Sequence, residues 1–245
     1  MSTLFKMIWT EFKILLRSPM AVGFTVFFPV MLVVIVGLVW GNTPDPKLGG
    51  YGGLDAMVPA YFALIIVIAG LINLPISLAT RREQGILRRF RATPLRPASV
   101  LGSQIFVNLL LAVVGALLLL VVGRALFNLR LPAEPLAVAL AFVLSGLSFF
   151  AVSFVVAGMA RTSDAARSIG LALYFPMMML SGAAFPRTSM PQGLQDASAW
   201  LPMTQVVTLL QGLWFGSGWN TVAVIVLIGM LIAGVLIATR TFRWE

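Results

Sequence analysis

Residues 79–103 read ATRREQGILRRFRATPLRPASVLGS and separate two long apolar runs of the chain. This stretch holds six of the seventeen basic residues among 245. A Lys- and Arg-rich loop between two membrane spans is commonly an anchor that stays on the cytoplasmic side. The stretch therefore marks a boundary between spans, and its simplest interpretation is a topological anchor.

The order of residues within this stretch also predicts a short helix. Thr80 and Glu83 have the spacing of a capping box, in which each side chain binds a backbone N–H of the first helical turn. Three apolar side chains that follow share one helical face: Ile86, Leu87 and Phe90. Pro94 then ends the helix. We predict a basic helix with one apolar face that begins at Thr80 and lies between two spans.

The composition is that of an integral membrane protein. Hydrophobic residues make up 60% of the chain and charged residues 10%, with a mean hydropathy of +0.99. Such a chain has too little polar surface to cover a soluble globule. The net charge of +9 is spread over several short loops, so no continuous basic face is available to bind nucleic acid.

The apolar runs predict an all-α protein with one transmembrane domain over residues 1–245. Residues 2–17 place apolar and basic side chains on opposite sides of a helix, which is typical of an amphipathic helix in the membrane interface. A hydrocarbon core of about 30 Å needs about 20 apolar residues. We predict six spans, at about 20–40, 56–78, 100–123, 136–160, 168–184 and 221–239, with residues 79–99 as the loop between the second and third.

Residues 185–220 differ from the spans, because their apolar pieces are short and interrupted by prolines. They predict one or two re-entrant helices between spans five and six. Six spans place both termini on one side of the membrane, and thirteen of the seventeen basic residues fall on that side. By the positive-inside rule we expect the termini and the 79–99 loop to be cytoplasmic in a plasma or inner membrane.

The residues that are absent limit the chemistry. The chain has no Cys and no His, and the predicted spans contain no Asp, Glu, Lys or Arg. An intramembrane hydrolase would lack a base to activate a serine, and no metal site is predicted. Proton- or sodium-coupled carriers generally use a charged group inside the membrane, although a few coordinate ions through backbone and hydroxyl oxygens. An ion-coupled secondary transporter, or another polytopic protein that works without an ATPase, stays open as the alternative.

Active transport by this chain would need an energy source from elsewhere. The three lysines are Lys6, Lys13 and Lys47, and none follows a glycine. The phosphate-binding loop of P-loop ATPases, G-x-x-x-x-G-K-[ST], is therefore missing. The chain cannot hydrolyse nucleotide through such a loop.

Two sets of motifs resemble a known family. The first is REQGIL at 82–87, followed by ATPL at 92–95 and LG at 101–102. The second is LSGAAFP at 180–186, followed by MP at 190–191, LQ at 194–195 and LPMT at 201–204. Both resemble the ABC type-2 transporter permeases of the daunorubicin-resistance kind, in which the last motif commonly reads NPLT. The resemblance extends over essentially the whole chain.

The resemblance implies a permease of an ABC exporter, with two permease copies, identical or related, and two separate ATPase subunits that bind ATP and Mg²⁺. The chain itself would hold no cofactor and would not be an enzyme. The 79–99 loop would carry the coupling helix that docks on the ATPase, through Thr80, Arg82, Glu83, Gly85, Ile86, Leu87 and Phe90. The re-entrant segment would include Gly182, Phe185, Pro186, Pro191 and Pro202.

The cargo is only broadly indicated. Asn73 in the second span and Asn108 in the third are candidates to line a pathway, and each could equally join neighbouring helices. The lack of charge within the spans favours a neutral or amphipathic cargo over a small ion. The family resemblance implies a drug-like, lipid-like or glycolipid cargo that leaves the cytoplasm or the inner leaflet, in contact with membrane lipid.

Overall fold

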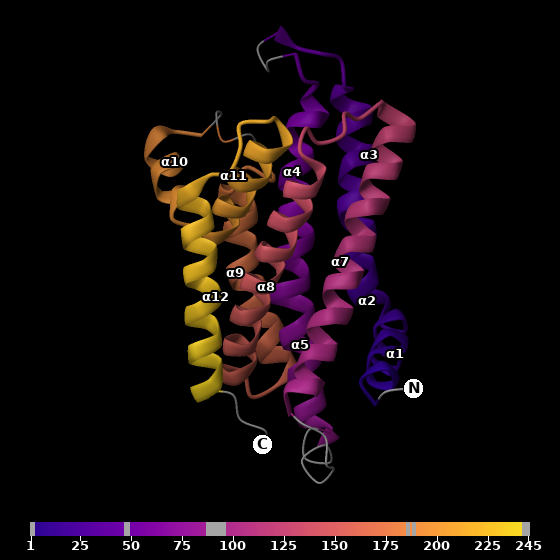
Figure 1. Ribbon diagram of the computed structural model, residues 1–245, viewed down its shortest axis with the longest axis vertical. Helices are drawn as coiled ribbons and strands as arrows, with labels where there is room; N and C mark the ends of the chain where they lie inside the picture. Colours follow the sequence, from indigo (N-terminus) through magenta and orange to yellow (C-terminus); the bar gives the residue numbers. More distant parts are fainter. Residues whose placement is uncertain (1–2, 47–49, 87–96, 185–186, 188–189, 242–245) are drawn as a thin grey trace.

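The computed structural model describes residues 3–46, 50–86, 97–184, 187 and 190–241, and in this part of the chain it is helical with no strand (Figure 1). The all-α fold class is thereby confirmed. In chain order the elements are α1 (Thr3–Leu16), α2 (Pro19–Val22), η1 (Gly23–Phe27), α3 (Phe28–Trp40), α4 (Gly53–Val67), η3 (Ile68–Asn73), α5 (Leu74–Glu83), α7 (Pro97–Phe127), α8 (Pro135–Met159), α9 (Ser163–Leu180), α10 (Gln192–Ala199), α11 (Pro202–Trp214) and α12 (Thr221–Thr241), of which η1 and η3 are π-helical.

Five helical runs in the described residues are long and apolar enough to cross a membrane: Pro19–Trp40, Gly53–Glu83, Leu101–Phe127, Pro135–Met159 and Thr221–Arg240. The predicted fifth span corresponds to α9. That helix has 18 residues, begins with a polar turn that contains Asp164, and carries Pro176 inside it. It is not one of the five runs, so the predicted count of six spans is not confirmed.

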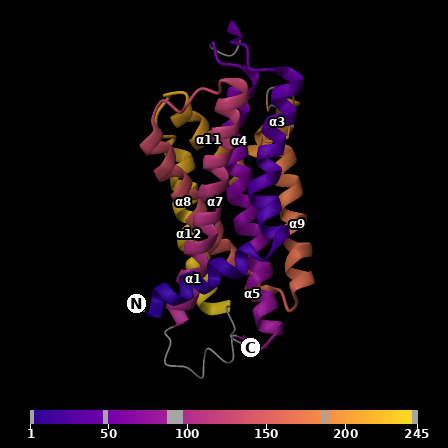
Figure 2. The same cartoon turned by 90° about the vertical axis from the view of Figure 1, so that its right-hand side faces the viewer.

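The continuous run α4–η3–α5 forms the centre of the bundle. In its apolar stretch 83% of the residues are buried, whereas only 17% of the residues in the apolar stretch of α12 are buried. The run contacts α3, α8, α9 and α11, and α12 lies against the outer side of α8 (Figures 1 and 2). Movement of this central helix would therefore reach most of the other spans.

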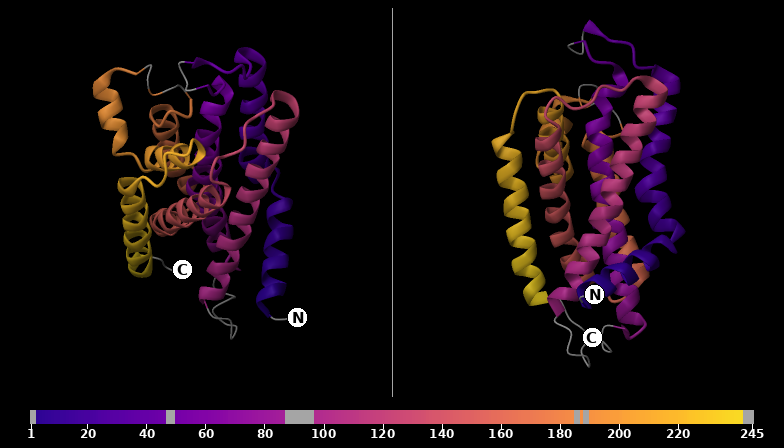
Figure 3. Two further views of the ribbon diagram at one scale, coloured as in Figure 1. Left: turned by 45° about the horizontal axis from the view of Figure 1, so that its top comes forward. Right: turned by 45° about the vertical axis from the view of Figure 1, so that its right-hand side comes forward.

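The two ends of the bundle are built differently. At one end α1 lies across α7 (Figure 2) and is joined to the last turn of α5. At the other end α10 stands at the edge of the bundle and leads into the largely buried α11 (Figure 3). The helix predicted at residues 2–17 is α1. The segment 185–220 does contain two helices, and their re-entry into the membrane stays a prediction.

At the end of the bundle away from α1, a buried carboxylate joins two interhelical loops by hydrogen bonds. Asp55 is 1% exposed and accepts hydrogen bonds from the backbone N–H groups of Gly52 and Arg130 at 3.2 and 3.0 Å. Its Oδ1 also accepts a hydrogen bond from Asn42 Nδ2 at 3.0 Å. The charge of Asp55 is therefore satisfied by three donors, which join the α3–α4 and α7–α8 connections.

Each of the two π-helical segments precedes a proline. Pro29 is in the first turn of α3, directly after η1, and Pro75 is in the first turn of α5, directly after η3. Proline has no N–H and its ring collides with the carbonyl four residues before it. A π turn shifts the bonding register to i→i+5 and is often found at functional sites. The two segments are joined by a hydrogen bond of 2.6 Å from Asn73 Nδ2 to Thr25 Oγ1.

The proline after η3 leaves one carbonyl without its helical partner. In the π register the N–H of Leu74 binds the carbonyl of Ala69. The next bond in this register would join the N–H of residue 75 to the carbonyl of Gly70, but Pro75 has no N–H. Ser153 of α8 donates its hydroxyl hydrogen to the Gly70 carbonyl instead. An unsatisfied carbonyl in an apolar environment is costly. Ser153 therefore both satisfies the break in the central helix and joins it to α8.

We predict that Ser153→Ala lowers the free energy of unfolding by about 1–2 kcal/mol, because the Gly70 carbonyl loses this donor. The matched control is Ser145→Ala on the same helix, since Ser145 is fully buried and its hydroxyl has no hydrogen-bond partner in the described part of the chain. That change should be neutral or slightly stabilising. Reversible unfolding in mixed detergent measures both, and equal effects of the two substitutions would contradict this role for Ser153.

Candidate functional site

The predicted helix start at Thr80 is wrong, because the second span continues as a helix through this position to Glu83. The carbonyl of Thr80 accepts a hydrogen bond from the N–H of Gln84 at 3.0 Å, as in a helix interior. A capping box needs free N–H groups in a first turn, and none is available at Thr80. The helix ends at Glu83 instead, and Gly85 has a φ of +67°, the left-handed conformation common just after a helix.

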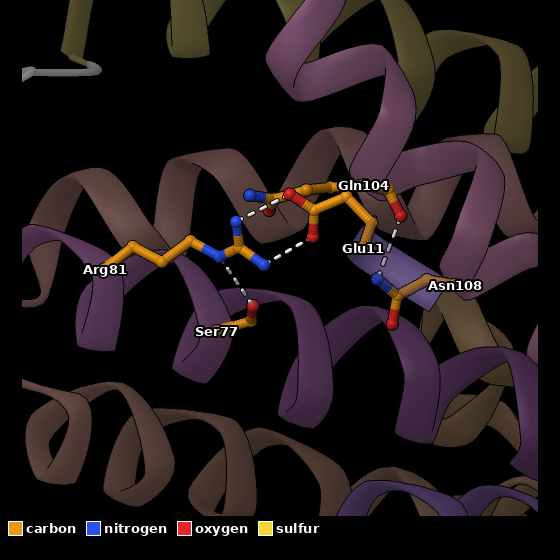
Figure 4. A network of polar contacts seen from close by, with 5 residues as sticks. All are labelled: Glu11, Ser77, Arg81, Gln104 and Asn108. Carbon is orange, nitrogen blue, oxygen red and sulfur yellow. Dashed lines mark hydrogen bonds and ion pairs between the residues drawn. The ribbon is translucent and has the colours of Figure 1, made fainter. Parts of the chain in front are cut away.

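The first charge in the last turn of α5 binds α1. Arg81 Nη1 lies 2.6 Å from Glu11 Oε1, and Arg81 Nη2 pairs with Glu11 Oε2 (Figure 4). Each residue is 7% exposed. Arg81 Nε also lies 3.4 Å from Ser77 Oγ. This two-pronged geometry is the arrangement in which guanidinium and carboxylate groups bind most specifically.

The next residue binds the end of α8. Arg82 Nη1 donates to the carbonyls of Ala157 and Ala160, at 2.9 and 3.0 Å. The last carbonyls of a helix lack partners within the helix and carry a partial negative charge. The guanidinium of Arg82 supplies both the donor and the complementary charge.

Glu83 binds the start of the following helix. Its Oε1 accepts a hydrogen bond of 3.1 Å from the N–H of Ser163, the first residue of α9. The first N–H groups of a helix carry the partial positive charge that favours a carboxylate. Thr162 caps the same turn by accepting from the N–H of Ala165 at 3.1 Å. The capping role predicted for Glu83 therefore exists, but it serves α9.

We call Arg81, Arg82 and Glu83 the α5 junction. Successive residues of a helix point about 100° apart, so three neighbours in the sequence can reach three different elements. Here they reach α1, the end of α8 and the start of α9. A displacement of the last turn of α5 would pull on three helices through charge-assisted hydrogen bonds.

Two buried amides of α7 lie in the neighbourhood of the Arg81–Glu11 pair (Figure 4). Gln104 is 2% exposed, and neither its amide oxygen nor its amide nitrogen has a hydrogen-bond partner among the described residues. Asn108 is 5% exposed and donates to the carbonyl of Gln104 at 2.9 Å. Buried amides are normally bonded, so this region keeps unused donors and acceptors beside a strong ion pair.

The two candidate pathway residues, Asn73 and Asn108, are both buried within the helix bundle. Asn73 is 9% exposed and joins η3 to η1 through Thr25. Asn108 bonds within its own helix. The geometry of Asn73 matches the helix-joining alternative. A role for either residue in a transport pathway stays a prediction.

The remaining candidate residues fall in two places. Ile86 is half-buried directly after the end of α5, while Leu87 and Phe90 lie outside the described residues. In the second motif Gly182 has a φ of +93°, Pro191 is the N-cap of α10, and Pro202 begins α11. Phe185 and Pro186 lie outside the described residues.

Sequence reasoning missed Glu11, Arg81 and Gln104 as parts of the site. In the sequence Arg81 is one of the six basic residues of the 79–103 stretch, and nothing in its immediate neighbours distinguishes it from the others. Glu11 is the single acidic residue among the cations of α1, and that contrast is the one signal that could have indicated a buried pair. The described residues contain no group of three Asp or Glu that could hold a metal ion.

The profile of the family described as ABC-2 type transporter matches residues 3–215. Two curated relatives are similar over 204 residues at 26% identity, an inner membrane transport permease of Escherichia coli (strain K12) and its counterpart from Shigella flexneri, both named YhhJ. The matched region covers 82% of this chain and 53% of each relative. The chain thus spans about half the length of the curated relatives it matches.

We predict that Arg81→Gln lowers the free energy of unfolding by about 3–5 kcal/mol, because it leaves the Glu11 carboxylate buried without a partner. The double variant Glu11→Gln/Arg81→Gln should recover part of that loss, since no charge then stays buried. Arg161→Gln, at an exposed arginine of the α8–α9 connection, is the control and should change stability little. Denaturant unfolding in detergent tests this; additive losses in the double variant would show that the pair is not coupled.

Proposed function

The chain belongs to the ABC-2 type transporter family, and we propose that it is the permease subunit of an ATP-driven exporter. Two permease copies, identical or related, would form the pathway. Two separate ATPase subunits would bind ATP and Mg²⁺, because this chain has no phosphate-binding loop. The curated relatives are named as inner membrane permeases, which supports placement in an inner membrane.

The observation that carries the proposal is the α5 junction. The residues that follow it, 86–90, are the predicted contact with the ATPase, and the junction binds α1, α8 and α9 directly before them. A rigid-body shift of the ATPase would reach the last turn of α5 first. From there the ion pair and the two helix-end contacts would carry it to three helices, in the way that packed elements switch between discrete arrangements.

The charges of the described spans support a cargo without a strong charge. Asp55 and the α5 junction lie at opposite ends of the central run, and each has hydrogen-bond partners. Between these two ends, residues 56–80 contain no Asp, Glu, Lys or Arg. We propose a drug-like, lipid-like or glycolipid cargo. Transport driven by a proton or sodium gradient in vesicles that contain only this chain would favour the secondary-transporter alternative instead.

We predict that the end of the bundle with α1 is cytoplasmic. The native chain has no cysteine, so single-cysteine variants need no background changes. Gln84→Cys should react with a membrane-impermeant maleimide only from the cytoplasmic side, and Thr43→Cys only from outside. Both positions are exposed and lie at opposite ends of the central run. The reverse pattern would overturn the orientation.

We predict that Leu87→Asp and Phe90→Asp each weaken ATPase binding by roughly 30-fold or more, because buried apolar anchors typically account for about 2 kcal/mol of an interface. Arg88→Ala and Arg89→Ala are the matched controls, since the helical pattern predicts both on another face than Leu87 and Phe90, where a solvated cation would contribute little. Co-purification of the ATPase, followed by ATP hydrolysis at equal expression, measures the effect. Full binding and hydrolysis with both Asp variants would mean that the 79–99 loop is only a topological anchor.

A further inference from the structure

A pocket separates the interfacial helix from the span it crosses. It has a volume of about 140 Å³ and is lined by Phe5, Ile8, Trp9 and Phe12 of α1 and by Leu110 of α7. All five lining side chains are apolar. Phe5 and Trp9 are 50% and 52% exposed, so the pocket borders the surroundings of the protein and not its core.

The two walls of the pocket indicate where it would lie relative to the lipid headgroups and acyl chains. Leu110 belongs to the apolar part of a membrane-crossing helix. An amphipathic helix such as α1 lies at the boundary between lipid headgroups and acyl chains. A pocket with one wall from each would extend from that boundary into the acyl-chain region, and its apolar lining matches a hydrocarbon chain.

The charge beside the pocket is positive. Lys13 Nζ lies 5.2 Å from the centre of the Trp9 ring, a cation–π contact that holds the ammonium group next to a pocket wall. Arg17 follows α1 and is exposed. Glu11 does not offset these cations at the surface, because it is buried and bound to Arg81. The ion pair therefore leaves α1 with a cationic exposed face.

We propose that this pocket binds an anionic phospholipid, with part of one acyl chain between α1 and α7 and the phosphate beside Lys13. The apolar lining accounts for the chain and the cation for the headgroup charge. A zwitterionic phospholipid could fill the same pocket but would gain no net attraction from Lys13. The site would tie α1 to the leaflet in which it lies, and this does not depend on the presence of an ATPase.

Trp9 makes the site directly measurable. The full chain is reconstituted in phosphatidylcholine vesicles, and either brominated phosphatidylglycerol or brominated phosphatidylcholine is added as the quencher of tryptophan fluorescence. The chain has six tryptophans, so the signal of Trp9 is the difference between the native chain and Trp9→Phe. We expect half-maximal quenching of Trp9 at about fivefold lower mole fraction of the anionic lipid.

Lys13→Gln should abolish this preference while quenching by brominated phosphatidylcholine stays unchanged. The matched control is Arg240→Gln, at an exposed arginine near the end of α12 and at the same end of the bundle, which should keep the preference. Since Lys13 is exposed, its substitution is not expected to unfold the chain. Equal quenching of Trp9 by the two lipids, or a preference that survives Lys13→Gln, would overturn the proposal.

Discussion

The buried ion pair between Arg81 and Glu11 is the interaction on which the organisation of the α1 end depends. A guanidinium at the end of an apolar helix must find a partner or lie in water. Arg81 finds it on α1, 70 residues away in the sequence, and thereby holds α1 against the bundle. The same pairing removes the acidic charge of α1 from its surface. Anchoring of α1 and the cationic character of its exposed face are thus two consequences of one contact.

A second constraint is set by the prolines that follow the π-helical segments. Pro75 prevents a regular helix in the middle of the central run, and the resulting π segment η3 is held by Ser153 of α8 and by Thr25 of η1. The α5 helix, ten residues long, connects this point to the junction at its other end. A displacement of the α5 junction would therefore be transmitted through α5 to η3, where the backbone hydrogen bonds have the irregular π register. This is the physical route by which we expect coupling to reach the centre of the bundle.

Features set by neighbouring residues could be predicted from the sequence, whereas contacts between residues far apart in the sequence could not. Charge-free apolar runs identify helices without any knowledge of their neighbours, and five of the predicted spans coincide with membrane-length helices. The four-residue pattern at Thr80 was misleading, because a Thr and a Glu three positions later also occur inside a helix, where the backbone has no free N–H. The contacts of Arg81, Arg82 and Ser153 join residues 70 to 83 positions apart. A single sequence carries no direct signal for such pairings.

The three charges at the end of α5 each hold a different helix. Hydrogen exchange of the full chain in lipid nanodiscs, resolved by segment, tests it most directly in Arg81→Gln and Glu83→Gln. We expect the largest rise in exchange rate in α1 for the first variant and in the first turn of α9 for the second. Unchanged exchange in both segments, or the same increase in every helix for both variants, would contradict it.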